Sequence, residues 1–367
     1  MKVLLCTPYK PGPQDNHGGI NIWAENILEH YHTFTSETDI HLIPFNRKNK
    51  IKSGIFERYR KGYLEYSKLI NVAVKQLDNS FDVLHLCTSA SISLIKDYIL
   101  LKKAKHKGVK TVLHLHFGRI PQLIKQHNWE WLLFQKVMNY TDEAIVMDMK
   151  SFKALNDDGY KNVHYLPNPL SNAIMKQVDS EANTVKRDSS KISFVGHVIP
   201  DKGVYELVEA CNKLQNIKLF IYGKVDSSVR AKMQQIANNE NWLIFEGEVE
   251  HERVIRELLS TNIFVLPSYT EGFPNVILES MACGCATVAT SVGAIPEMLA
   301  VDSLQPCGLC CDVKNVDELY NNIKFFIESP QNTSLFAERA VKRVNEMYVV
   351  QKVWEQLDGI WRELSEK

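Results

Sequence analysis

The chain has 367 residues, with 43 basic and 43 acidic side chains, so its formal net charge is zero. At about 150 residues per domain, this length predicts two domains. The composition, 45% hydrophobic and 23% charged residues, indicates a globular chain and excludes wholesale disorder. The neutral balance lacks the strong basic excess that is typical of nucleic-acid binders.

In the first half of the chain, short apolar runs alternate with longer helical patterns. The apolar run at residues 1–6 is cut short by Thr7 and Pro8, so it predicts a buried first strand rather than a signal peptide. No run reaches the ~18 apolar residues of a membrane span, and we expect a cytoplasmic protein. The predicted strands here are 3–6, 40–44, 83–87, 111–116, 144–147 and 163–166.

The second half repeats this alternation, with helices predicted over 204–214, 226–238 and 316–328. Most apolar runs are continuous, as in strands covered on both faces, so we expect an α/β fold of two doubly wound, Rossmann-like domains. The predicted strands are 192–195, 218–222, 243–245, 263–266, 286–289 and 308–311.

Domain boundaries follow from a change in composition. Prolines after Leu166 and a polar stretch before Lys191 predict a linker. We expect a first domain over 1–170, a linker over 171–190 and a second domain over 191–348. The last segment, 349–367, reads as an amphipathic helix that could close the second domain or return to the first.

The eight cysteines are not expected to form a disulfide framework, because no secretory signal accompanies them. A C-x2-C-C group near the C-terminus could hold zinc, but no histidine follows it at ligand spacing. We favour the interpretation that these cysteines, and the Cys-Gly-Cys pair that precedes them in the chain, are small buried apolar side chains. The residues concerned are Cys283, Cys285, Cys307, Cys310 and Cys311.

The densest candidate site follows the predicted strand 263–266. Gly272 permits a tight turn, Pro274 suits the first turn of a helix, and free amides at a helix start bind anions. Glu271 would then lie in the loop and Glu279 inside the helix, so that each carboxylate could hold a different part of one ligand. Two glutamates eight residues apart could also mark only a solvated helix face.

The string from Glu271 to Glu279 resembles the E-x7-E motif of the retaining family 4 glycosyltransferases with the GT-B fold. Residues 281–290 and 292–297 resemble the strand entry and loop that follow this motif in the family. The resemblance covers nearly the whole chain. It implies two Rossmann-like domains that face a central cleft, with the nucleotide-sugar on the second.

The opening of the second domain, residues 194–204, also resembles the family. There an arginine and a lysine clamp the donor diphosphate. Lys202 matches the lysine, whereas His197 stands in place of the arginine, and an imidazole lacks the permanent charge and the fork of a guanidinium. A surface lysine and a strand-end histidine are the alternative interpretation.

In the first domain, the Gly18–Gly19 pair after the first strand resembles the family's loop that faces the donor phosphates, although such a pair could be only a turn. His116 aligns with the family's active-site histidine, expected to contact the donor sugar. A satisfied core histidine is the alternative, favoured more for His114 than for His116.

The complete site that the resemblance implies is as follows. The catalytic residues are His116, Lys202 and Glu271. The donor-binding residues are Gly18, Gly19, Gly196, His197, Lys202, Gly223, Lys224, Glu248, Val249, Glu271, Gly272, Phe273, Pro274, Asn275, Val276 and Glu279. No metal and no further cofactor are expected, since no D-x-D follows a strand.

The expected activity is retaining transfer of a sugar from a nucleotide-sugar, with a UDP-sugar favoured, to a saccharide or lipid-linked acceptor in polysaccharide biosynthesis. No nucleophile is evident, so a front-face displacement is implied. Two alternatives stay open: another GT-B enzyme, such as a sugar-nucleotide epimerase, or a scaffold without catalytic activity.

The zero net charge hides an asymmetry. Residues 1–170 carry 23 basic and 16 acidic side chains, a balance of +7, and residues 171–367 carry 20 and 27, a balance of −7. Two basic clusters, at 47–61 and 102–110, are either solvated helix faces or a surface for anionic lipid, which suits a peripheral enzyme on the inner face of the membrane.

Overall fold

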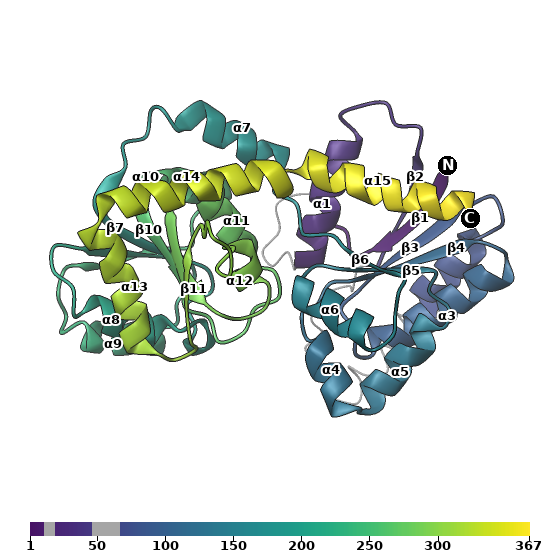
Figure 1. The fold of residues 1–367 in the computed structure, drawn as a ribbon, viewed down its shortest axis with the longest axis horizontal. Coiled ribbons are helices and arrows are strands. Elements are labelled where there is room, and N and C mark those ends of the chain that lie inside the picture. The colour runs from purple at the N-terminus through teal and green to yellow at the C-terminus, as the bar shows by residue number, and fades with distance from the viewer. Residues whose placement is uncertain (11–18, 46–66) are drawn as a thin grey trace. The chain divides into compact units, whose positions relative to one another are not determined.

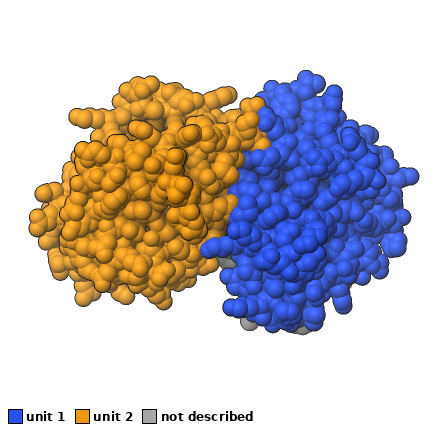
Figure 2. Space-filling view, in the orientation of Figure 1, with its two compact units in different colours: residues 1–169, 353–367 blue, residues 170–352 orange. Residues whose placement is uncertain are grey.

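The computed structural model describes residues 1–10, 19–45 and 67–367, which form two units (Figure 2). Unit 1 consists of residues 1–169 and 353–367, and unit 2 of residues 170–352. The basic cluster at 47–61 and Gly18 lie outside the described residues.

Unit 1 contains one parallel sheet of six strands in the order β2-β1-β3-β4-β5-β6. Strands β1, β3, β4 and β5 are buried almost throughout, as their continuous apolar runs predict. The strands are β1 Lys2–Thr7, β2 Asp39–Pro44, β3 Val83–Thr88, β4 Lys110–Leu115, β5 Glu143–Val146 and β6 Val163–Tyr165.

Helices cover both faces of this sheet (Figure 1). On one face, Leu84, Leu86 and Leu113 pack in a large apolar core with four helices. On the other, Trp23 of α1 (Gly19–Tyr31) and Trp361 of α15 (Val350–Glu366) are fully buried. The four helices of the first face are α3 Ser93–His106, α4 Ile120–Gln126, α5 Trp129–Met138 and α6 Met149–Asp157.

Unit 2 contains a second parallel sheet of six strands, in the order β12-β11-β10-β7-β8-β9. The expected α/β architecture with two parallel sheets is therefore confirmed, and every predicted strand is present. The strands are β7 Asp188–Val195, β8 Lys218–Tyr222, β9 Leu243–Gly247, β10 Thr261–Leu266, β11 Ala286–Thr290 and β12 Leu309–Cys311. Its helices are α7 Asn172–Glu181, η1 (3₁₀) Pro200–Lys202, α8 Val204–Cys211, α9 Ser227–Ile236, α10 His251–Ser260, α11 Asn275–Ala282, α12 Ile295–Met298, α13 Val316–Glu328 and α14 Pro330–Met347.

The stretch expected as a linker, 171–190, holds a helix and the first residues of β7. Ser171 caps α7 by accepting a hydrogen bond from the amide of Ile174. Arg256 of α10 donates to the carboxylate of Glu181 at 2.8 Å, which ties α7 to unit 2. A polar composition thus conceals a helix that has a side-chain cap at its start and a charged contact at its end.

The C-terminal helix α15 begins at Val350, and its residues from Val353 onward belong to unit 1. Its apolar stripe is buried at Val353, Leu357 and Trp361. Within the described ranges, no helix combines the length and the apolar character required to cross a bilayer.

Candidate functional site

The sequence-predicted donor residues of unit 2 gather at one edge of its sheet. The strand order reverses direction between β7 and β10, and in open α/β sheets ligands bind outside the carboxyl ends of the strands at such a point. The segment 196–202 follows β7, and the segment 267–274 follows β10. The topology therefore brings two motifs together that lie about seventy residues apart in the chain.

The two charged residues of these segments meet directly. Lys202 Nζ lies 2.5 Å from Glu271 Oε1, and both side chains are largely buried. The amide of Tyr269 donates to the carbonyl of Asp201 at 2.8 Å, which joins the two loops through the backbone as well. A cation suited to phosphate thus stands beside a carboxylate suited to sugar hydroxyls.

Glycines allow the loops to approach so closely. Gly203 has φ +68°, and a Cβ there would lie 2.0 Å from the carbonyl oxygen of Pro267. Gly293 has φ +55°, and its Cβ would lie 2.4 Å from the carbonyl oxygen of Glu271. Because these contacts are with backbone atoms, a side chain at either position requires the loop itself to shift.

The helix after Glu271 begins one residue later than expected. Pro274 is the N-cap with extended backbone, and Asn275 and Val276 are the first helical residues of α11. No side chain caps this end, so its first amides point outward at the positive end of the helix dipole. The Oδ1 atom of Asn275 is buried there without a hydrogen-bond partner among the described residues.

Glu279 lies inside α11 and is buried. It accepts a hydrogen bond from Nε2 of His251 at 3.1 Å. This hydrogen bond raises the pKa of His251 above its ordinary value of 6.5. The sequence analysis did not identify His251. Its position directly after the loop that follows β9 could have indicated that it lies at the same edge of the sheet.

The remaining predicted residues of unit 2 border the same edge. Gly223 has φ +137°, its amide donates to the carbonyl of Gly247 at 2.7 Å, and a Cβ on it would meet the carbonyl oxygen of Gly196 at 1.9 Å. The ends of β7, β8 and β9 are thereby joined. The side chains of His197, Lys224 and Glu248 are exposed, Val249 and Gly272 are half-buried, and Phe273 is buried against Tyr348.

In unit 1, Gly19 opens α1 and is exposed. His116 follows β4, and both of its ring nitrogens are buried without a hydrogen-bond partner in the described part of the chain. Its ring centroid lies 4.0 Å from that of His114 and 5.1 Å from that of Trp23. Burial lowers the pKa of His116 to about 3, so the imidazole is neutral at physiological pH.

A further buried histidine extends this cluster and was not predicted. His85 of β3 accepts a hydrogen bond at Nδ1 from Nε1 of Trp361 at 2.9 Å. With Cys87 and His114 it forms the one group of metal-ligand type found in the described ranges. In the neutral ring that accepts at Nδ1, the proton is on Nε2, so neither nitrogen of His85 has a free lone pair for a metal. The arrangement is a buried aromatic core in which the hydrogen bond from Trp361 fixes the ring of His85.

The cysteines of unit 2 do not converge on one point. Four of their thiols donate to separate carbonyls, those of Ile255, Leu258, Met298 and Ala289. Burial raises the pKa of Cys307 to about 11 and that of Cys311 to about 12, so both are neutral thiols. These observations favour their role as small buried apolar side chains.

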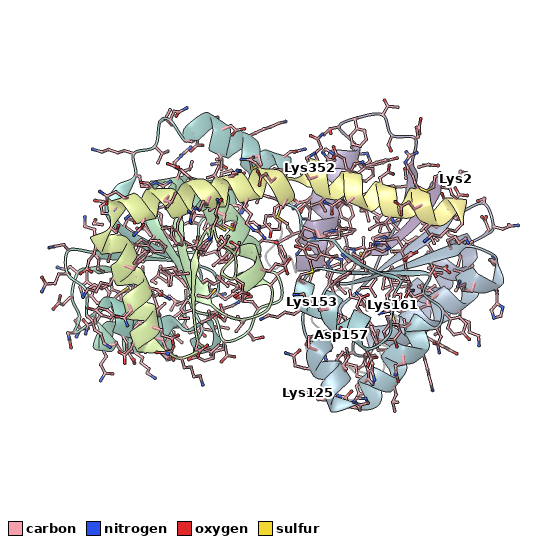
Figure 3. All side chains as sticks on the ribbon, in the orientation of Figure 1. Lys2, Lys125, Lys153, Asp157, Lys161 and Lys352 are labelled. Carbon is pink, nitrogen blue, oxygen red and sulfur yellow. The ribbon has the colours of Figure 1, made fainter. Side chains whose placement is uncertain are left out.

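One surface hollow lies away from the predicted residues, between α4 and α6 of unit 1. Lys125 and Asp157, which Figure 3 labels on these two helices, are part of its lining. Pro121, Ile124, Ala154 and Asp158 complete its lining. It is open and contains no buried polar group, so the switch point in unit 2 remains the candidate site.

Known proteins are similar to this chain in sequence or in fold. The family model "Glycosyl transferases group 1" matches residues 175–343. An uncharacterized glycosyltransferase of Methanocaldococcus jannaschii is 25% identical, over 100% of this chain and 99% of that protein.

Solved structures of low sequence identity show the same GT-B fold. A lipopolysaccharide outer core galactosyltransferase, WaaB, superimposes with a TM-score of 0.71 at 16% identity and covers 98% of this chain and 99% of its own. The HepE protein of Anabaena in complex with UDP-glucose gives a TM-score of 0.65 at 17% identity, and each chain is covered completely (100%).

Proposed function

Since this chain belongs to the group 1 glycosyltransferases, family 4, of the GT-B fold, we propose that it transfers a sugar with retention of configuration from a UDP-sugar to a saccharide or lipid-linked acceptor. It is a glycosyltransferase with a nucleotide-sugar donor. The observation that carries the finer proposal is the pairing of Lys202 with Glu271 at the switch point. It sets a phosphate-binding cation beside a group that can hold sugar hydroxyls.

The diphosphate is proposed to lie against Lys202 and the first amides of α11, at Asn275 and Val276. Both features attract negative charge, and that charge increases on the departing diphosphate in the transition state. His197 would add a hydrogen bond, and Gly19 of unit 1 a backbone amide. When phosphate oxygens take over Lys202, the carboxylate of Glu271 is released to accept from the sugar.

The nucleoside is proposed to lie beside Gly223, Lys224, Glu248 and Val249. Glu279 would accept from the ribose hydroxyls, since its carboxylate is held in place by His251. From unit 1, His116 is the residue proposed to meet the donor sugar. Its neutral imidazole could serve there as a hydrogen-bond partner and not as a cation.

The chemical step is proposed as a front-face displacement. The bond from the anomeric carbon to the diphosphate oxygen breaks, and the acceptor oxygen bonds to the same face of that carbon. The leaving phosphate oxygen takes the proton of the acceptor hydroxyl. A covalent mechanism instead needs a carboxylate that attacks the anomeric carbon, as in retaining glycosidases, and the sequence offers no evident nucleophile.

Uridine as the base is supported by the similarity in fold to HepE, whose structure contains UDP-glucose. Surface polysaccharide as the product class is supported by the similarity in fold to the lipopolysaccharide galactosyltransferase. A peripheral position at an anionic membrane is proposed from the basic excess of residues 1–170.

Thermal-shift measurements with UDP-, GDP- and ADP-sugars test the donor, because a ligand that binds only the folded state raises the unfolding midpoint. We expect a shift with UDP-sugars that Lys202→Met abolishes. Lys213→Met is the matched control, because Lys213 makes an exposed ion pair with Asp317 in the same unit. A Lys202→Met protein that retains the full shift contradicts the proposed site, and product NMR that shows inversion contradicts the mechanism.

A further inference from the structure

Two adjacent helices of unit 1 present large apolar side chains to solvent. On α3 and the residue before it, Ile92, Ile95 and Ile99 are 56%, 49% and 40% exposed. On α5, Trp129 and Leu132 are 59% and 56% exposed. Spacings of three and four residues place each set on one face of its helix. These five side chains have no role in the proposed donor site.

The starts of the two helices are joined by hydrogen bonds. Glu130 of α5 accepts from the amide of Ser91, two residues before α3, at 2.6 Å. Arg119 donates to both oxygens of the same carboxylate, at 2.8 and 2.5 Å, and to the hydroxyl of Ser91 at 3.0 Å. Because Ser91 precedes Ile92 and Glu130 follows Trp129, this network holds the two apolar stripes together.

The loop before α3 is unusual in its backbone. Ala90 and Ser91 both have positive φ, +64° and +56°, in the region that favours glycine. Two such residues in succession are costly and persist where the surroundings hold them. Here the contacts of Ser91 with Glu130 and Arg119 hold the turn, and Ile92 emerges from it into solvent.

The exposed charges on the two helices themselves have one sign. Within α3 and α5, both wholly described, the two carboxylates are buried: Asp97 pairs with Lys96, and Glu130 is engaged by Arg119. One helical turn beyond the apolar residues, the same faces carry Lys103 on α3 and Lys136 on α5, and both lysines are exposed. Lys105, farther along α3, pairs with Asp142.

We propose that this surface, made of Ile92, Ile95, Ile99, Trp129 and Leu132 with Lys103 and Lys136, docks on an anionic lipid bilayer. Apolar side chains enter the interfacial layer, where tryptophan is favoured, and lysines contact the headgroup phosphates. The proposed function supplies the reason for such a surface, because an enzyme that uses a lipid-linked acceptor has to reach it at the bilayer. The binding of the surface to lipid does not itself require that function.

Charge favours a bilayer over a second copy of the chain. A symmetric contact between two such surfaces brings the lysines of both copies together with no exposed carboxylate from α3 or α5 to balance them. An anionic bilayer supplies both the negative charge and the apolar phase. A partner protein would need an acidic rim around an apolar patch.

Cosedimentation of the full chain with vesicles tests the proposal. The vesicles are phosphatidylcholine alone, or phosphatidylcholine mixed with phosphatidylglycerol, at low and at high salt. We expect binding to the mixed vesicles at low salt, weakened by salt. Ile95→Glu/Trp129→Glu and Lys103→Glu/Lys136→Glu should each weaken this binding about tenfold or more. Leu304→Glu, at a fully exposed leucine (100%) of unit 2, is the matched control and should bind as wild type.

Vesicle binding that is unchanged in both double variants overturns the proposal. So does the absence of binding, and so does a dimer that Ile95→Glu/Trp129→Glu dissociates in the absence of lipid. The assay contains no donor or acceptor. The donor-induced thermal shift of the same variants is expected to match wild type, so failure of the membrane surface and failure of the proposed enzyme site are distinguishable.

Discussion

Lys202 and Glu271 form an ion pair of 2.5 Å although they lie on different loops, one after β7 and one after β10. Each charge neutralises the other, so neither is left unpaired in a largely buried place. The pair joins the two segments of unit 2 on which the proposed chemistry depends. Its loss should therefore affect both the binding of the donor and its turnover.

Removal of either charge should lower kcat/KM by about 100- to 1,000-fold, the usual loss for one preorganised electrostatic group. Because each single change leaves the partner charge unbalanced, we expect Lys202→Met/Glu271→Gln to cost less than the sum of the two singles. Steady-state kinetics of the four proteins of this cycle measure the coupling. Strictly additive losses contradict a shared role.

Gly293→Ala should disturb the loop of Glu271, because the new Cβ would lie 2.4 Å from the carbonyl oxygen of that residue. The positive φ adds about 1–2 kcal/mol of strain. The control is Gly247→Ala, which has φ +75° and nothing within 4 Å of its Cβ. Both variants should lose stability in urea, and only Gly293→Ala should also lose the donor-induced thermal shift.

His251 should stabilise unit 2 at low pH. Its pKa is raised in the folded state by the hydrogen bond to Glu279, so the folded protein binds this proton more tightly than the unfolded chain. The contribution is complete below pH 6.5 and is lost as the pH rises through the folded-state value. The unfolding midpoint of His251→Gln should lie below that of wild type under acidic conditions and converge with it under alkaline ones.

The histidine cluster of unit 1 should act in the opposite direction. Burial lowers the pKa of both His85 and His116 to about 3, so the unfolded chain takes up protons that the folded unit does not. Unit 1 should lose stability progressively as the pH falls from about 6.5 toward 3. The fluorescence of Trp23 and Trp361, buried beside these rings, reports the transition; acid stability equal to that at neutral pH contradicts the buried, neutral state.

Trp361→Phe should destabilise unit 1 by about 1–3 kcal/mol, because it leaves Nδ1 of His85 buried without its donor. Trp129→Phe is the control, since Trp129 is exposed and makes no such bond. Urea denaturation, monitored by hydrogen exchange of the β3 amides, measures the difference in unfolding free energy between the two variants. Equal stability of the two variants would show that the indole N–H contributes little.

Local pattern determined the elements and the main motif of this protein. Continuous apolar runs placed most of the described strands, because a strand covered on both faces needs no alternation. The segment from Glu271 to Glu279 was identified as a loop and a helix start, because glycine permits a tight turn and proline suits the first turn of a helix. The polar stretch 171–190 was expected as a linker, because α7 is held by a cap and ion pairs that leave little apolar periodicity.

Tertiary structure decided which distant residues meet. Strand order brought Lys202 to Glu271 and His251 to Glu279, and the return of the C-terminal helix placed Trp361 against His85. The joining of α3 and α5 through Glu130 likewise depends on the packing of two helices that β4 and α4 separate in the chain. Periodicity records which face of an element is buried. It does not record which element covers that face, because this is set by sheet order and crossover.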